Sequence, residues 1–242
     1  MTQLAENLAV LEEAITAACR NAGRTRADIE LMAVSKTYPA AIIAEAAALG
    51  LTLFGENRVQ EFVGKAAELS VLRNSAVTPP RVHLIGHLQS NKSARAVELF
   101  DGIDSLDSLR LAERLNEAAK KSGKKLPVLI EVKLSSEETK AGLIPDSFEA
   151  GELLERLPEF ANLETRGLMT IAPWGVAEDE TRACFRSLRE WRERWATSYP
   201  RLAFDMLSMG MSGDFDLAIA EGATRIRVGT SLFGSRPAME KN

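Results

Sequence analysis

Cysteine, histidine and tyrosine are scarce in this chain of 242 residues, which contains two of each. The cysteines, Cys19 and Cys184, lie far apart and lack the paired spacing of a zinc knuckle or a disulfide framework. The histidines, His83 and His87, are too few for a zinc site of the usual kind. Metal-dependent chemistry and a disulfide-stabilised fold are therefore both disfavoured.

Long apolar runs and an excess of one charge are also absent. No stretch of about 18 consecutive apolar residues occurs, which is the length that a membrane-spanning helix requires. The first ten residues include Glu6 and no continuous apolar segment, so we expect no secretory signal and a cytoplasmic location. Thirty basic and thirty-four acidic residues give a net charge of −4. Nucleic-acid-binding proteins usually show a basic excess, so we expect neither a nucleic-acid nor a membrane partner.

The composition is that of a folded globular protein, with 45% hydrophobic and 26% charged residues. No proline- or glycine-rich linker and no low-complexity segment divides the chain, which predicts one domain over residues 1–242. The length suits a (β/α)8 barrel, which typically needs about 250 residues.

Strand-like and helix-like segments alternate along the chain after a helix predicted over Gln3–Asn21. The expected strands are Ile29–Val34, Leu51–Phe54, Val82–Ile85, Gly102–Asp104, Leu126–Val132, Leu163–Met169, Leu202–Ser208 and Thr224–Val228. The expected helices between them are Ala40–Leu49, Val59–Leu69, Ser93–Leu99, Ser108–Lys121, Ser147–Arg156, Glu178–Ala196 and Phe215–Glu221.

This alternation indicates parallel strands joined by right-handed crossovers. Eight such units can close into a barrel, and the competing architecture is an open, doubly wound sheet. No glycine-rich dinucleotide fingerprint follows the first strand, which counts against the open sheet. We therefore predict an α/β fold, a single (β/α)8 TIM-type barrel with an extra N-terminal helix.

In such barrels the chemistry lies at the carboxyl ends of the strands, and Lys36 follows the first strand there. A lysine that is partly buried at a barrel mouth has a lowered ammonium pKa and can form a Schiff base with an aldehyde. From position alone a solvated loop lysine is the commoner case, and Lys133 and Lys140 have similar claims.

The loops after the last two strands carry a candidate phosphate site. Gly229 and Thr230 follow the last strand, and a glycine there lets backbone N–H groups approach an anion closely. Ser212, in the preceding loop, can add a hydroxyl, and these loops are the usual phosphate position in barrels. An ordinary glycine turn with serine and threonine caps is the alternative. A lysine at the first strand combined with a phosphate cradle at the last strands is the layout that pyridoxal 5′-phosphate (PLP) requires.

Five motifs, in this order along the chain, resemble those of the YggS/PROSC family, the pyridoxal phosphate homeostasis proteins, over essentially the whole length. They are AVSKTYP (Ala33–Pro39), FGENRVQE (Phe54–Glu61), HLIGHLQSNK (His83–Lys92), SMGMSGD (Ser208–Asp214) and RIRVGTSLFG (Arg225–Gly234). The family is also similar to the barrel domain of bacterial alanine racemases.

The resemblance implies a role for particular residues of this chain. Lys36 matches the lysine that forms the Schiff base with PLP, and Asn57 matches a residue lining the same site. Ser212, Gly229 and Thr230 match the phosphate contacts. By similarity to alanine racemases, Arg227 is expected beside the pyridine nitrogen of PLP.

The resemblance also implies a function, which is to hold PLP in the cell as a buffer or carrier that supplies apo-enzymes. A cation at Arg227 would disfavour a protonated pyridine, and an unprotonated ring is a poorer electron sink. The first alternative is a PLP-dependent amino-acid racemase of low activity, and the second is a barrel enzyme that acts on a phosphorylated metabolite without PLP. A racemase needs a second base opposite Lys36, and we expect neither Tyr38 nor Tyr199 to supply it. Because the chain shows no second domain of the racemase kind, we expect a monomer.

Four further polar residues are interpreted as structural. We expect His83 to be hydrogen-bonded within its strand and His87 to pack on or cap the following turn, although both could carry protons near PLP. Asp104 and Glu131 are interpreted as partners of inward-facing cations. The basic run Lys120, Lys121, Lys124 and Lys125 is interpreted as a solvated helix end.

Overall fold

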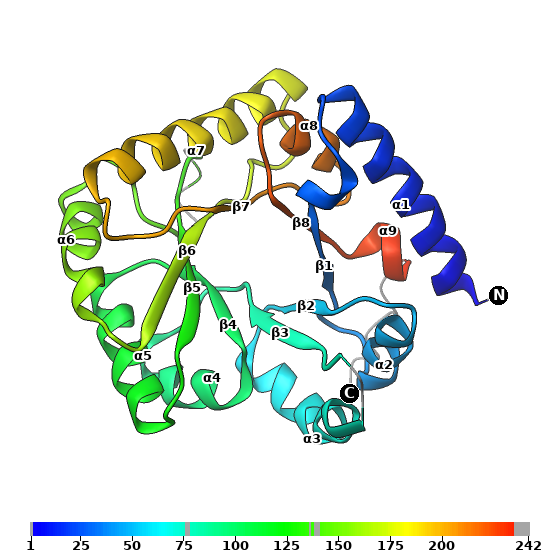
Figure 1. Cartoon of the computed structure of the whole chain (residues 1–242), viewed down its shortest axis with the longest axis horizontal. Coiled ribbons are helices and arrows are strands. Elements are labelled where there is room, and N and C mark those ends of the chain that lie inside the picture. Colours follow the sequence, from blue (N-terminus) through cyan, green and yellow to red (C-terminus); the bar gives the residue numbers. More distant parts are fainter. Residues whose placement is uncertain (1, 76–77, 136, 138–140, 235–242) are drawn as a thin grey trace.

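A computed structural model describes residues 2–75, 78–135, 137 and 141–234 of the chain. Its strands form a closed barrel in the order β1 to β8, and every neighbouring pair is parallel. The barrel closes where β1 pairs with β8, with Glu30 opposite Arg225 and Ala33 opposite Val228. Figure 1 shows the helices as a ring around these strands. The barrel prediction is confirmed, and the open sheet is excluded.

The elements follow the predicted alternation. The strands are β1 (Glu30–Val34), β2 (Leu53–Glu56), β3 (Arg81–Leu84), β4 (Gly102–Leu106), β5 (Leu126–Glu131), β6 (Leu163–Met169), β7 (Met206–Ser208) and β8 (Arg225–Val228). The helices are α1 (Gln3–Asn21), α2 (Ala40–Ala48), α3 (Val59–Ser75), α4 (Ser93–Leu99), α5 (Leu109–Lys121), α6 (Phe148–Arg156), α7 (Glu178–Ser198), α8 (Phe215–Ala220) and α9 (Thr230–Phe233). Short 3-10 turns lie at Arg26–Asp28, Ser90–Lys92 and Leu157–Glu159.

The boundaries have local causes. The Thr2 hydroxyl accepts a hydrogen bond from Ala5 N at the start of α1, and the Ser108 hydroxyl accepts one from Leu111 N at the start of α5. The strand predicted over Leu202–Ser208 is wrong in its first half, because only Met206–Ser208 pairs with its neighbours.

Two hydrophobic clusters fill the fold. The larger one lies between the strands and the surrounding helices, and it includes Ala33 of β1. A separate small cluster lies inside the barrel and consists of Met32, Val34, Leu53 and Ile85. Because side chains alternate along a strand, Met32 and Val34 face inward while Ala33 faces the helices.

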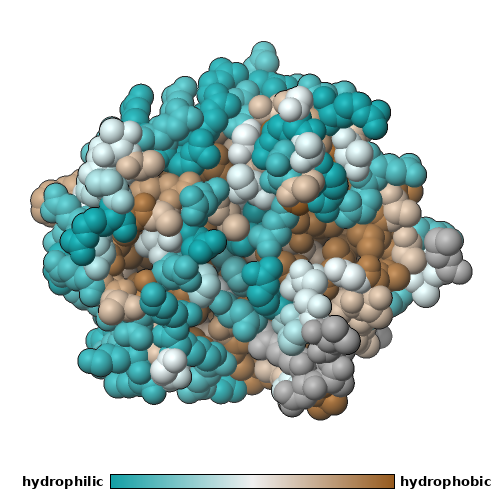
Figure 2. Space-filling model, viewed as in Figure 1, coloured by the Kyte–Doolittle hydropathy of each residue, from teal (hydrophilic) through white to brown (hydrophobic). Residues whose placement is uncertain are grey.

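The outer surface is formed by the helices that surround the barrel. α1 packs beside α8 and α9, which places the first helix next to the last turns of the chain (Figure 1). Figure 2 shows mainly hydrophilic side chains on the viewed face, with the largest hydrophobic area toward α9 and α2. Within the described residues, no helix is long and apolar enough to cross a membrane. The same residues contain no group of three or more metal-ligating side chains, and Cys19 and Cys184 are buried and form no disulfide.

Candidate functional site

Lys36 lies in the turn directly after β1, at the carboxyl end of the barrel, and is half-buried. The following residue, Thr37, has a φ of 70°, which a non-glycine residue adopts only when its surroundings hold it there. The Thr37 N–H donates a hydrogen bond to the carboxylate of Glu61 in α3. The turn that carries Lys36 is therefore fixed from outside the barrel.

A buried ionic cluster, formed by Ser35, Glu56 and Lys65, supports the same turn. Lys65 Nζ lies 3.0 Å from the Ser35 carbonyl oxygen and 2.8 Å from Glu56 Oε1. The Ser35 hydroxyl donates to the same Glu56 oxygen at 2.7 Å. Burial raises the pKa of Glu56, although Lys65 and Ser35 act in the opposite direction. Sequence reasoning missed Lys65, since helical spacing alone gives no reason to expect a buried ammonium group on α3.

Arg227 of β8 points into the barrel and is 4% exposed. Its Nη1 lies 2.7 Å from the Ser208 carbonyl oxygen and 3.0 Å from the Ser208 hydroxyl, while Nη2 lies 2.8 Å from the Thr170 carbonyl oxygen. Burial lowers the pKa of its guanidinium, and nearby carboxylates oppose that effect. These contacts place an oriented positive charge in the interior, held by the last residue of β7 and the residue that follows β6.

The predicted phosphate residues come together in space. Gly229 is the N-cap of the single-turn helix α9, which begins at Thr230. The N–H of Ser231 donates to the Ser212 hydroxyl at 3.4 Å, which joins the loops after β7 and β8. A Cβ atom added at Gly229 would lie 3.3 Å from the Val34 carbonyl oxygen, so this loop passes close to the end of β1. Ser212 and Gly229 are half-buried, and Thr230 is exposed.

Asn57 follows β2 at the same end of the barrel and is half-buried. Its carbonyl oxygen would be only 2.3 Å from a Cβ atom at Gly86, so the close approach of these two loops requires glycine. The Asn57 side-chain amide makes no hydrogen bond to the residues that the structure describes. It is therefore available to a ligand at the barrel mouth.

The two tyrosines occupy structural positions. The Tyr38 hydroxyl donates to the Gly234 carbonyl oxygen at 2.8 Å, and its ring packs on Phe233 with centroids 5.1 Å apart. Tyr199 is the C-cap of α7, in the connection that leads to the amino end of β7. Tyr199 thus lies at the end of the barrel away from Lys36, as predicted.

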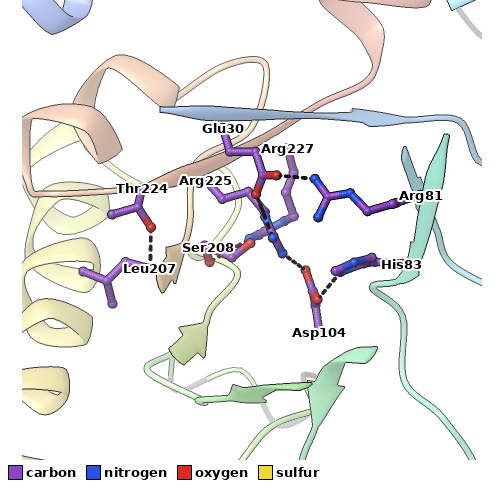
Figure 3. Close-up of polar contacts among 9 residues, drawn as sticks. All are labelled: Glu30, Arg81, His83, Asp104, Leu207, Ser208, Thr224, Arg225 and Arg227. Carbon is purple, nitrogen blue, oxygen red and sulfur yellow. Dashed lines mark hydrogen bonds and ion pairs between the residues drawn. The ribbon is translucent and has the colours of Figure 1, made fainter. Parts of the chain in front are cut away.

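His83 and Asp104 belong to an ionic network near the amino end of the barrel (Figure 3). His83 Nδ1 lies 2.8 Å from Asp104 Oδ1, and Arg225 lies 2.8 Å from both Asp104 and Glu30. Burial would raise the pKa of Asp104, but His83 and Arg225 lower it. A cavity of about 360 Å³ opens here, lined in part by these side chains and by Arg81. The structural interpretations of His83 and Asp104 are therefore confirmed.

Two other interpretations, those of His87 and of the basic run, need correction. His87 does not cap its own turn, because its Nδ1 lies 2.9 Å from Asp107 Oδ2 in the loop after β4. Lys124 is not simply solvated, because its Nζ donates to the Val97 carbonyl oxygen at 2.9 Å and so caps the end of α4. Lys133 is half-buried, and Lys140 lies outside the described residues.

Glu131, at the end of β5, departs most from expectation. It forms no ion pair with a described cation, and its Oε2 is buried without a hydrogen-bond partner. Burial raises the pKa of Glu131 to about 7, with Asp107 adding to the effect and Arg227 and His87 opposing it. The predicted pairing of Glu131 with a cation is wrong.

The residues at the barrel mouth fit a phosphorylated aldehyde. They supply an amine at Lys36, a hydroxyl with neighbouring backbone N–H groups at Ser212 and Ser231, and a fixed cation at Arg227. Glu131 Oε2 is buried without a hydrogen-bond partner at the end of β5. Such orphaned atoms are uncommon in native proteins and are typical of sites that receive a ligand.

Comparison with known proteins agrees with this geometry. Residues 7–237 match the family model of the alanine racemase N-terminal domain. The pyridoxal phosphate homeostasis protein of Escherichia coli (strain K12) is 42% identical over 244 residues, which covers 100% of both chains. The chain belongs to the pyridoxal phosphate homeostasis protein family. The family member of Pseudomonas aeruginosa is likewise 42% identical, over 98% of this chain and 97% of its own.

One solved structure of a relative is described with a bound ligand. PipY of Synechococcus elongatus PCC7942, described with PLP bound, superposes with a TM-score of 0.83 at 43% identity. The alignment covers 96% of this chain and 100% of PipY. Alanine racemase of Clostridium difficile is 16% identical with a TM-score of 0.68, and this likeness concerns the fold alone.

Proposed function

We propose that this protein binds PLP at the carboxyl end of its barrel and acts in PLP homeostasis, as a buffer or carrier without substantial catalysis of its own. One observation carries the proposal. The turn that contains Lys36 follows β1, and β1 pairs with β8, whose following loop is joined to Ser212 by the hydrogen bond from Ser231 N. The PLP-bound structure of the related PipY supports it.

Each residue has a distinct task in this proposal. The amine of Lys36 condenses with the aldehyde carbon of PLP and releases one water molecule, which leaves a covalent C=N bond. Ser212 and the backbone at Gly229 and Thr230 hold the phosphate, since N–H and hydroxyl donors suit an anion. Asn57 contacts the ring, and Arg227 lies beside the ring nitrogen.

When bound, PLP supplies an aldehyde and an electron-withdrawing ring. Arg227 limits what that ring can do, because a fixed guanidinium disfavours a second positive charge on the pyridine nitrogen. Its contacts with Ser208 and Thr170 hold the guanidinium in one place. The protein therefore retains the cofactor without stabilising the carbanions on which PLP enzymes depend.

The tyrosines also favour a carrier over a racemase. A two-base racemase needs a proton carrier on the ring face opposite Lys36. The hydroxyl of Tyr38 is engaged by Gly234, and Tyr199 lies at the far end of the barrel. In our proposal the protein works in the cytoplasm and supplies apo-enzymes, and its monomeric state stays a prediction.

Borohydride reduction of the protein incubated with PLP tests the proposal. We expect the reduced adduct on the peptide that contains Lys36, and its loss in Lys36→Ala while the circular dichroism spectrum is retained. Lys133→Ala serves as the matched control and should keep the adduct. An adduct that maps to another lysine in the wild type would refute the assignment, and rapid racemisation of alanine by the wild type would refute the carrier function.

A further inference from the structure

Glu131 is a buried acid that the proposed function does not yet use. It ends β5 at the barrel mouth and is 5% exposed. Its main chain is fixed, because its carbonyl oxygen accepts a hydrogen bond from Leu143 N at 2.8 Å. Its carboxyl Oε2, by contrast, has no hydrogen-bond partner. Buried polar atoms without a partner in the protein are uncommon, so the position of this oxygen suits an additional hydrogen-bonding partner.

The protein groups around Glu131 are committed to other partners. Arg227, on β8, directs its Nη atoms to Ser208 and Thr170. His87, after β3, is bonded to Asp107, after β4, at 2.9 Å. These three charged groups are the ones that act on Glu131, and none of them forms an ion pair with it.

Glu56, which ends β2 and faces the surrounding helices, gives a useful contrast at the same end of the barrel. Its Oε2 is also unpaired, but its Oε1 accepts hydrogen bonds from Lys65 and Ser35. Glu56 is therefore anchored by protein contacts on one side of its carboxylate. Glu131 has no such anchor, so its carboxyl group is the better candidate for a contact with the ligand.

We infer that Glu131 donates a hydrogen bond directly to bound PLP, at the phenolate oxygen of the ring. The inference rests on the proposed function. PLP carries two anionic acceptors, the phosphate and the phenolate. The loops at Ser212 and Gly229 take the phosphate, which leaves the phenolate for a donor on the opposite side of the mouth. The raised pKa of about 7 keeps much of the Glu131 carboxyl protonated near neutral pH, so it can donate.

Binding of pyridoxine 5′-phosphate tests this contact separately from the chemistry of Lys36, because this alcohol keeps the ring hydroxyl and phosphate but has no aldehyde. Dissociation constants would be measured at pH 6 and pH 8 for the wild type, Glu131→Gln and Glu131→Leu. The matched control is Glu164→Gln, since Glu164 is exposed on β6 and pairs with Arg166. Melting curves would confirm that each variant is folded.

The expected results separate the donor from a merely structural role. Glu131→Leu should weaken binding about tenfold at pH 6, whereas Glu131→Gln, which keeps an N–H donor, should stay within about threefold of the wild type. Wild-type binding should weaken from pH 6 to pH 8 more than that of Glu131→Gln, in which the titrating group is gone. Equal affinities for all the variants, or equal losses in the Gln and Leu variants, would overturn the inference.

A second readout does not depend on affinity. The infrared C=O band of a protonated carboxyl group should shift when pyridoxine 5′-phosphate binds to the wild type, and Glu131→Gln should lack the shifting band. A band that shifts equally in both proteins would overturn the assignment. If PLP is trapped on Lys36 but Glu131 variants behave as the wild type, this inference alone fails. If the wild type binds neither compound, the proposed function fails with it.

Discussion

The stability of the ligand-free protein should fall as the pH rises, in a way that depends on Glu131. Burial raises the pKa of this carboxyl from 4.5 to about 7 in the folded state. Between these values the folded protein binds more protons than the unfolded chain, so the free energy of unfolding decreases with pH. The stabilising contribution is complete below pH 4.5 and is lost as the pH rises through 7.

The size of this change in the free energy of unfolding follows from the shift in the pKa of Glu131. A difference of one pKa unit corresponds to about 1.4 kcal/mol, so the full contribution is about 3 kcal/mol, most of it lost between pH 5 and pH 8. Glu131→Gln removes the titrating group while keeping the shape of the side chain. Relative to the wild type, the variant should therefore gain stability as the pH rises.

Urea unfolding followed by circular dichroism at pH 5, 6, 7 and 8 measures this difference. Other titrating groups contribute to both proteins, and they cancel when the two curves are subtracted. Glu164→Gln should give a flat difference curve, because its exposed pair with Arg166 contributes little. A flat curve for Glu131→Gln, or one in which the variant loses stability as the pH rises, would refute the reasoning.

Four other substitutions give separate tests. Ser212→Ala and Thr230→Val should each weaken PLP affinity by about tenfold to a hundredfold, measured by titration of its absorbance, while an adduct still forms at high PLP concentration; unchanged affinity in both would place the phosphate elsewhere. Lys65→Met should lower the free energy of unfolding, measured in urea, by about 3–5 kcal/mol, because it leaves the buried Glu56 without its cation. A loss below about 1 kcal/mol, which is typical of a surface ion pair, would argue against that role. Arg227→Met should lower the free energy of unfolding by about 1–3 kcal/mol, since it leaves carbonyl groups unpaired, and wild-type stability would contradict the contacts described.

The alternation of strands and helices could be predicted because hydrophobic periodicity reflects which faces are buried. The same hydrophobic pattern wrongly predicted a strand at residues 202–205. There Leu202 packs against the core, and Phe204 packs on Trp195 with ring centroids 6.4 Å apart. These side chains are buried by a helix rather than within a strand. Hydrophobicity reports burial but does not report which backbone groups pair.

The candidate site could be predicted only in part, for a related reason. Lys36, Ser212 and Gly229 stand in recognisable motifs at strand ends, and barrel topology brings strand ends together. The contacts of Arg227 with Ser208 and Thr170 depend on the register of three strands, which no local pattern encodes. The unpaired carboxyl of Glu131 could not be foreseen either, since being unpaired is a property of its surroundings.

The proposed site can form only late in synthesis, because it lies where the first strand, β1, pairs with the last strand, β8. Glu30 pairs with Arg225, and Tyr38 is bonded to Gly234, so the first strand meets these partners only after residues 225–234 have been made. An incomplete chain holds Lys36 but lacks the loops that would take the phosphate. A ligand that bridges Lys36 and Gly229 also ties these two strands together. By binding only the closed barrel it adds to the free energy of unfolding as its concentration rises. Occupancy would then mark chains in which β8 has been made and the barrel has closed.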